Sequence, residues 1–298
     1  MDRLEAMQVL VDIANAGSLS AAARHLNMPL ATVSRKLADL EKHLQTRLII
    51  RSTRRLTLTE AGEAYVATCK RILEEVEQAE KLVAGEYTEP KGDLVLTAPV
   101  VLGRMHVLPI INDFLKAYPN INIRAVFVDR WINLIEEHVD IAVRVGQLPD
   151  SGLVALPVGA ARQVVCASPE YFKRHRPPVR PGDLFAHACV AFEGALPSHA
   201  WLFAENNQPV STPVRARLVV NSAEAAIEAA IAGIGVTRVL SYQIARHVKE
   251  KKLKVVLEAF EPPALPIHLV HAGQGRLPLK LRAFLDFTVP RLRRVSSF

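Results

Sequence analysis

Residues 19–62, LSAAARHLNMPLATVSRKLADLEKHLQTRLIIRSTRRLTLTEAG, decide how the rest of the chain is interpreted. Small and apolar residues recur there at the spacing of one helix face, and they are Ala22, Ala23 and Leu26. Either Ser18 or Ser20 can cap the start of this helix. Asn27 tolerates a left-handed backbone, and Pro29 suits the first position of a following helix. The segment therefore predicts two short helices separated by a tight turn.

The second predicted helix, residues 29–44, has one apolar face and one polar face. Its apolar residues lie at i, i+4, i+7 and i+11, and they are Val33, Leu37, Leu40 and Leu44. Short side chains near the start of the other face let the backbone approach a DNA groove, where hydroxyl groups and Arg35 can bond to bases or phosphates. An upstream amphipathic helix with Leu4, Met7, Val9, Leu10 and Ile13 is expected to support this pair from behind.

A basic hairpin follows, with strands expected at 48–50 and 56–59 and its tip at 51–55. From Arg35 to Arg55 the chain has seven Lys or Arg residues against two acidic ones, a balance that suits a phosphate backbone through counterion release. A solvated basic face on an ordinary helical bundle is the alternative. However, the spacing of the two helices, the proline at a helix start and the arginine-rich hairpin tip agree with one another, and together they favour double-stranded DNA as a partner. The residues predicted to contact DNA are Ser20, Pro29, Leu30, Ala31, Thr32, Ser34, Arg35, Lys36, Arg51, Arg54 and Arg55.

This segment resembles the DNA-binding domain of LysR-type transcriptional regulators, which is a winged helix-turn-helix. The shared pattern is A-A-x-x-L, V-S-R-x-L-x-x-L-E, T-R-L and R-x-x-R-x-L-x-L-T-E-A-G, and it spans Ala22 to Gly62. The chain departs from the pattern at Gln45, where the family usually has Gly, so a slightly strained turn is expected. It also departs at Leu30 and Ala31, where many members carry Gln and Pro.

A long helix is predicted from Thr59 to about Val83, before Gly85. Along it, apolar or small residues recur at alternating spacings of four and three, and they are Tyr65, Cys69, Ile72, Val76, Ala79 and Val83. Such a narrow heptad stripe favours a dimerisation helix, while packing onto the chain's own core is the alternative. The resemblance implies the same, because the family dimerises through this linker helix.

Composition limits the class of protein. A length of 298 residues predicts two or three domains, and 50% apolar residues provide a sizeable core. The chain has neither a run of eighteen apolar residues nor a signal-peptide pattern, which predicts a cytoplasmic protein without a membrane partner. Three widely spaced cysteines, Cys69, Cys166 and Cys189, predict reduced structural thiols. The net charge of +7 is consistent with a polyanionic partner.

Beyond a hinge signal at 85–92, short apolar strands alternate with helices, which predicts an α/β region with parallel sheets. Strands are expected at 94–98, 121–128, 140–145, 163–167, 189–192, 218–221, 253–257 and 267–271, and helices at 103–118, 223–232 and 279–289. The resemblance continues through GDLVLTAP (92–99), DIAVRVG (140–146), ASPEYF (167–172), VNSAEAAIEAAIAGIGV (219–236), PIHLVHA (266–272) and LRAFLDF (281–287).

The resemblance implies a fold of three parts. A winged helix-turn-helix, mainly α, is expected at 1–58, followed by a linker helix and hinge at 59–88. An α/β effector-binding domain, two-lobed like a periplasmic binding protein, is expected at 89–298. Its first lobe covers about 92–161 and 264–298, and its second lobe covers about 162–263.

Two helix starts in this second half favour binding of a small polar ligand or anion, because free backbone N–H groups gather there at the carboxyl ends of strands. The alternative is that these side chains merely cap their own helices, and that Arg144 pairs with Asp140 or another carboxylate. The family's inducers bind between the lobes at these segments, so the resemblance favours a site. The candidate residues are Thr97, Pro99, Val100, Val101, Arg144, Phe203, Asn221 and Ser222.

Catalytic and metal signatures are weak. No nucleophile elbow, phosphate-binding loop or dinucleotide-binding glycine motif is present in the sequence, and no His or Cys pair has a third ligand nearby, so no enzyme activity, cofactor or metal is expected. The favoured interpretation is a transcription factor that responds to a small-molecule effector, for example a carboxylate or an aromatic compound. It is expected to form a dimer or tetramer and to meet RNA polymerase. The alternatives are a solute-binding protein and an enzyme fused to a DNA-binding head.

Overall fold

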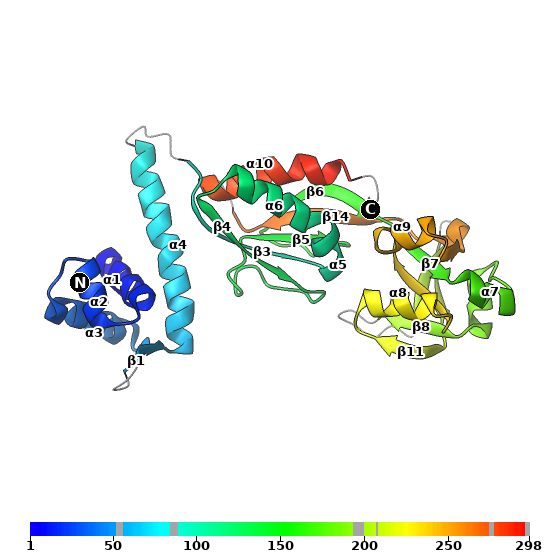
Figure 1. The fold of residues 1–298 in the computed structure, drawn as a ribbon, viewed down its shortest axis with the longest axis horizontal. Coiled ribbons are helices and arrows are strands. Elements are labelled where there is room, and N and C mark those ends of the chain that lie inside the picture. Colours follow the sequence, from blue (N-terminus) through cyan, green and yellow to red (C-terminus); the bar gives the residue numbers. More distant parts are fainter. Residues whose placement is uncertain (52–55, 84–88, 193–199, 207, 274–276, 296–298) are drawn as a thin grey trace. The chain divides into compact units, whose positions relative to one another are not determined.

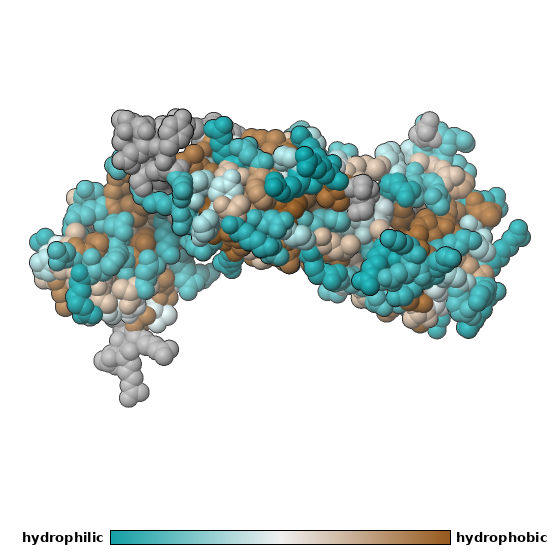
Figure 2. Space-filling view, turned by 45° about the horizontal axis from the view of Figure 1, so that its top comes forward, coloured by the Kyte–Doolittle hydropathy of each residue, from teal (hydrophilic) through white to brown (hydrophobic). Residues whose placement is uncertain are grey.

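The computed structural model describes residues 1–51, 56–83, 89–192, 200–206, 208–273 and 277–295 (Figure 1). Contacts within the chain divide it into two compact units, Met1–Glu89 and Pro90–Phe298. None of the described helices is both long and apolar enough to span a bilayer. Hydrophilic side chains cover most of the face seen in Figure 2, with smaller hydrophobic areas between them.

The first unit contains the two predicted helices, the hairpin and the long helix. Its elements are α1 (Arg3–Ala16), α2 (Leu19–His25), α3 (Leu30–Leu44), β1 (Ile49–Arg51), β2 (Leu56–Leu58) and α4 (Glu60–Val83). The predicted stripe of α3 lies in the core of the unit, where Val33, Leu37 and Leu40 are buried against α1. Leu4 was predicted to share the apolar face of α1, but it is exposed near the start of that helix.

The turns of this unit follow their capping residues. Ser18, and not Ser20, caps α2 by accepting a hydrogen bond from Ala21 N at 3.2 Å. Asn27 has the predicted left-handed backbone, with φ of 53°. Pro29 precedes α3 as its N-cap residue, one position earlier than predicted. Gln45 ends α3 with φ of 51° and ψ of 29°, so the residue that replaces the family's glycine does occupy a left-handed conformation.

The first lobe of the second unit is a mixed sheet with helices on one face (Figure 1). The strand order is β4-β3-β5-β14-β6, with parallel pairing of β3 to both β4 and β5 and antiparallel pairing of β14. The strands are β3 (Gly92–Ala98), β4 (Ile121–Phe127), β5 (Ile141–Val145), β6 (Val154–Ala161) and β14 (Leu265–His271). The helices are α5 (Val100–Leu102), a π-helical turn (Gly103–Val107), α6 (Leu108–Ala117) and α10 (Leu279–Arg293).

The second lobe is another mixed sheet, of order β11-β8-β12-β7-β13, and apolar clusters cover both of its faces. Its strands are β7 (Gln163–Ala167), β8 (Cys189–Phe192), β11 (Ala216–Val220), β12 (Val236–Leu240) and β13 (Lys254–Val256). Helices α8 (Ala223–Ile231) and α9 (Ser241–Lys249) pack on one face. The other face carries α7 (Pro169–Arg174), a 3-10 turn η2 (Pro181–Ala186) and the hairpin β9 (Ala200–Glu205) with β10 (Gln208–Pro213). The second lobe also has a short 3-10 turn, η3 (Glu258–Phe260).

All eight predicted strands are confirmed, with ends that differ by no more than a few residues. The expectation of parallel sheets was wrong in part, because each sheet combines parallel pairs with antiparallel ones. The sequence patterns did not predict β6, the β9–β10 hairpin, β12, α7 or α9. Glycine and proline interrupt β6, and β12 is only five residues long and follows the short glycine-containing turn 232–235, so periodicity did not identify these strands.

The three cysteines are free thiols and all are buried, which confirms the prediction of unpaired structural thiols. Burial raises the pKa of Cys166 to about 12, far above its ordinary value of 9.0. Burial likewise raises the pKa of Cys69 and of Cys189 to about 11.

Candidate functional site

Helix α3 presents its first turns to solvent while its opposite face is fully buried. Leu30 is 50% exposed, and Ala31 and Arg35 are also exposed. Thr32 and Ser34 are half-buried beside them. The predicted contact of these residues with a DNA groove stays a prediction, and their exposure at the start of α3 is consistent with it.

Lys36 differs from its neighbours, because its ammonium group forms an ion pair with the Glu5 carboxylate of α1. This contact links α3 to the helix behind it, and the Lys36 side chain is only 20% exposed. Lys36 therefore holds α3 on α1, and its predicted contact with DNA stays a prediction. Ser20 is exposed on α2, as a phosphate contact requires.

The wing is an antiparallel pair of short strands that α3 holds in place. Ile49 pairs with Leu58, and Arg51 pairs with Leu56. The carboxylate of Glu41 on α3 accepts hydrogen bonds from Leu48 N at 2.8 Å and Ile49 N at 3.1 Å. The orientation of the wing thus depends on a residue of α3. Residues 52–55 of the tip, with Arg54 and Arg55, and the Arg51 side chain lie outside the described residues.

The T-E-A-G motif joins the wing to α4. Thr59 Oγ1 donates to Arg47 O at 2.8 Å and accepts from Gly62 N at 2.9 Å, which caps the helix. A Cβ atom on Gly62 would lie 2.0 Å from Leu48 O, so a side chain at this position would collide with the β1 segment.

The heptad stripe of α4 divides into two parts. Cys69 is fully buried in the core of the first unit, and Tyr65 packs against the same cluster. The interpretation as a dimer seam is therefore wrong for Cys69, which the chain's own core covers, while the seam role of the half-buried Tyr65 stays a prediction. Ile72 and Val76 are half-buried, and the side chains of Ala79 and Val83 lie outside the described residues.

In the first lobe, the predicted ligand-binding segment between β3 and α5 is already satisfied by the chain itself. Thr97 is buried and donates through Oγ1 to Val126 O at 2.8 Å. Val100 N, at the start of α5, donates to Asp129 Oδ1 at 3.0 Å. Burial raises the pKa of Asp129. The Asp129 carboxylate thus occupies the helix start where a ligand anion was expected. Of the two neighbouring candidates, Pro99 is half-buried and Val101 is buried.

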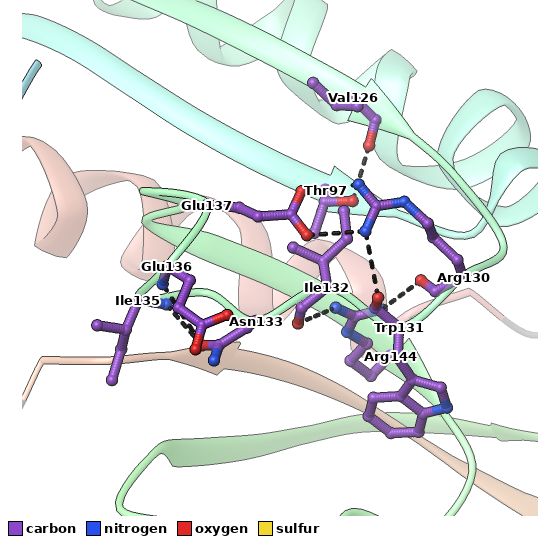
Figure 3. A network of polar contacts seen from close by, with 10 residues as sticks. All are labelled: Thr97, Val126, Arg130, Trp131, Ile132, Asn133, Ile135, Glu136, Glu137 and Arg144. Atoms are coloured by element: carbon purple, nitrogen blue, oxygen red, sulfur yellow. Dashed lines mark hydrogen bonds and ion pairs between the residues drawn. The ribbon is translucent and has the colours of Figure 1, made fainter. Parts of the chain in front are cut away.

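Arg144 lies on β5, and its side chain holds the loop 128–139 (Figure 3). It is 7% exposed and donates to Arg130 O at 3.2 Å and to Ile132 O at 2.9 Å. Its guanidinium also lies 5.1 Å from the centre of the Trp131 ring. These contacts replace the expected ion pair with a carboxylate, and burial lowers the pKa of Arg144. Arg144 therefore holds the loop rather than presenting a free cation to a ligand.

The same loop is closed by a second set of contacts in Figure 3. The guanidinium of Arg130 pairs with both carboxylate oxygens of Glu137, at 2.7 and 2.8 Å. The side-chain oxygen of Asn133 accepts from Ile135 N at 3.1 Å, which forms a local turn. Bidentate geometry makes such a pair directional, so the loop that carries Asp129 is well positioned.

In the second lobe, Ser222 caps α8 by accepting from Ala225 N at 3.4 Å, and Asn221 beside it is exposed. Phe203 was a wrong candidate. It is 2% exposed and lies in the apolar cluster with Trp201 and Leu184, because alternate residues of β9 face the lobe core.

The two lobes meet through residues that sequence analysis missed. Arg104 of the first lobe forms an ion pair with Glu224, which lies in the first turn of α8. The rings of His106 and Tyr242 meet edge to face at 5.7 Å, and Tyr242 is buried. Burial raises the pKa of Tyr242, and the nearby charge of Asp129 raises it further. Burial also raises the pKa of Asp129, with a smaller contribution from the charge of Glu224. Arg104 and Glu224 each follow a helix start that the sequence had singled out.

Among the described residues, no group of three or more His, Cys, Asp or Glu side chains could hold a metal ion. The arrangement as a whole offers an exposed helix beside a wing in the first unit. The second unit offers a polar junction between two α/β lobes.

Comparison with known proteins finds a family model for each of the two units. The family described as "Bacterial regulatory helix-turn-helix protein, lysR family" matches residues 4–63. The family described as "LysR substrate binding domain" matches residues 88–293. An HTH-type transcriptional regulator of Xanthomonas campestris pv. campestris (strain 8004) is 35% identical over 288 residues, which cover 95% of this chain and 84% of that protein.

Solved structures show the same architecture over nearly the whole chain. CrgA, a LysR-type transcriptional regulator from Neisseria meningitidis, is 32% identical with a TM-score of 0.62, covering 97% of this chain and 98% of its own. The full-length Vibrio cholerae virulence activator AphB is 26% identical with a TM-score of 0.61, covering 96% of this chain and 98% of its own. The chain therefore belongs to the LysR family of transcriptional regulators, with a helix-turn-helix DNA-binding domain and a two-lobed effector-binding domain.

Proposed function

We propose that this regulator binds its promoter through Leu30, Ala31, Thr32, Ser34 and Arg35 of α3, with the wing on the adjacent phosphates. The observation that carries this proposal is the exposure of Leu30 and Arg35 opposite the buried Val33 and Leu37. Arg35 supplies the donors for a base edge, and Ser20 and Pro29 lie close to the backbone of the DNA. Arg51, Arg54 and Arg55 supply cations for phosphates at the wing.

The dimer in this proposal forms through the second half of α4. Ile72 and Val76 continue the heptad stripe beyond the part that the first unit covers, and Ala79 and Val83 extend it in sequence. A dimer fixes the separation of two DNA-binding heads and so favours a partly palindromic site. Assembly into a tetramer, contact with RNA polymerase and a cytoplasmic location belong to the same proposal, and they rest on the family.

The effector in this proposal binds at the junction of the lobes, beside Pro99, Val100, Asn221 and Ser222. Thr97, Val101 and Arg144 position the surrounding segments. The ion pair between Arg104 and Glu224 connects the lobes at this place, so a ligand that changes it alters the lobe arrangement. The altered lobe arrangement in turn alters the spacing of the two DNA-binding heads in the dimer.

A mobility-shift assay with the chain's own upstream DNA tests the DNA-binding part, at about 100 mM salt where specific binding normally persists. Arg35→Ala is expected to remove the preference for this DNA over an unrelated sequence, by about 1–3 kcal/mol. Arg174→Ala removes the same charge from the second unit and serves as the matched control. Equal binding of both DNAs by the unmodified chain would contradict the proposal.

A further inference from the structure

The second lobe contains a pocket that is separate from the junction of the lobes. Its volume is about 390 Å³, and it lies between the end of η2 and the start of β11. The lining residues are Phe185, Ala186, His187, Ala188, Arg215, Ala216 and Arg217. Pockets that take small molecules have volumes of roughly 300–1,000 Å³, so this one is large enough for a compact ligand.

The pocket carries unbalanced positive charge. Arg215 and Arg217 are both exposed, and within the described part of the chain no ion pair joins either guanidinium to a carboxylate. Asp183, whose charge reaches His187, already accepts hydrogen bonds from Val179 N at 3.0 Å and from Arg180 N at 3.1 Å. The pocket therefore presents two free forks of N–H donors, which suit the two oxygens of a carboxylate.

One wall of the pocket is rigid. His187 is 6% exposed, and its Nδ1 lies 3.2 Å from the hydroxyl of Tyr171. The Tyr171 ring stacks on His175 with the ring centres 4.5 Å apart. Phe185, in contrast, is 77% exposed at the rim. An exposed phenyl ring beside three alanines provides an apolar surface that a flat ring can cover.

We propose that the second lobe binds a small aromatic carboxylate in this pocket, with its carboxylate on Arg215 and Arg217 and its ring against Phe185. The junction of the lobes has fewer free donors for a carboxylate. There Val100 N at the start of α5 already donates to Asp129, and Arg104 is already paired with Glu224. This site is independent of DNA binding and of the effector site proposed above. It does lie on β11, the strand that leads directly into Asn221, Ser222 and α8.

The test uses the full chain and benzoate as the probe, at constant ionic strength. Binding is followed by calorimetry and by the NMR signals of the His187 imidazole. Benzoate is expected to bind and to shift these signals, while benzyl alcohol and inorganic phosphate bind at least about tenfold more weakly. Arg217→Gln and Arg215→Gln are each expected to weaken benzoate binding by about tenfold or more, the loss of a charge-assisted pair.

Arg246→Gln on α9 is the matched control, because it makes the same charge change on the opposite face of the sheet. It is expected to leave benzoate binding unchanged. The proposal is overturned if benzoate does not bind, or if benzyl alcohol or phosphate binds as tightly as benzoate. It is also overturned if Arg246→Gln weakens benzoate binding as much as Arg217→Gln does. Benzoate binding that survives the combined Arg215→Gln and Arg217→Gln change would also overturn it, and would place the ligand elsewhere.

Discussion

Gln45 shows how one residue can carry a local cost that the surrounding fold tolerates. It ends α3 with φ of 51°, a conformation that costs a residue with a Cβ atom roughly 1–2 kcal/mol and costs glycine almost nothing. Its backbone N–H bonds to Lys42 O, as a helix C-cap does.

Gln45→Gly is expected to raise the free energy of unfolding by about 0.5–1 kcal/mol, less than the full cost because glycine also gains freedom in the unfolded chain. Chemical denaturation measures this change. Lys42→Gly places the same residue inside α3 and is expected to lower stability by about 1 kcal/mol. A loss of stability in both variants would contradict the account of the turn.

The buried thiols predict a dependence of stability on pH. In the folded chain the pKa of Cys166 is about 12, against an ordinary value of 9.0, so the folded state keeps a proton that the unfolded state releases. The free energy of unfolding should therefore fall as pH rises from about 9 towards 12. Denaturation of the unmodified chain and of Cys166→Ala measures the two slopes, and the variant's should be shallower. Equal slopes would contradict this assignment.

At the scale of the element, the wing depends on a carboxylate of α3. Glu41 accepts from both Leu48 N and Ile49 N, two donors that begin the strand β1. Sequence analysis found the strand and the helix but not this bond, because Glu41 appeared only as one of two acids in a basic stretch.

Glu41→Leu keeps roughly the size of the side chain but removes the carboxylate, whose Oε1 accepts hydrogen bonds from both Leu48 N and Ile49 N. It is expected to lower the free energy of unfolding by about 1–3 kcal/mol, the cost of leaving a partly buried donor unsatisfied. Binding to all DNA sequences should weaken together, because the wing loses its support. Asp39→Asn makes the same charge change on an exposed part of α3 and should leave stability unchanged within about 0.5 kcal/mol. Similar losses in both variants would contradict the anchoring role.

Elements with strong local signals could be predicted from the sequence, and pairs of distant residues could not. The period of Val33, Leu37 and Leu40 defines a buried helix face without further information. Lys36 and Arg35 look alike in sequence, yet only Lys36 meets Glu5, more than thirty residues away. Likewise, nothing local shows that Asp129 reaches Val100 N or that α1 covers Cys69.

At the scale of the whole molecule, the lobes are joined by the ring contact of His106 with Tyr242 and by the ion pair of Arg104 with Glu224, which is in contact with water. The Arg104 and Glu224 side chains are 60% and 45% exposed, so screening limits the strength of their attraction. A weak link of this kind can open when a ligand offers either side chain another partner, which suits a regulator that changes shape.

A double-mutant cycle of Arg104→Ala and Glu224→Ala should give a coupling energy of about 0.2–1 kcal/mol in chemical denaturation. Coupling should shrink further at high salt. Arg130 and Glu137, a bidentate pair within one loop of the first lobe, provide the comparison cycle. A coupling energy well above 1 kcal/mol would show that the lobes are locked together rather than lightly linked.

The most direct test of the whole account is a footprint of the full chain on its own upstream DNA. A dimer that places two α3 helices in successive major grooves should protect two half-sites about 10–10.5 base pairs apart, centre to centre, or a multiple of that spacing. Arg35→Ala should abolish this protected pattern at a concentration where Arg174→Ala retains it. A single unpaired protected site, or an identical footprint from Arg35→Ala, would contradict the claim that α3 contacts the promoter as one head of a pair.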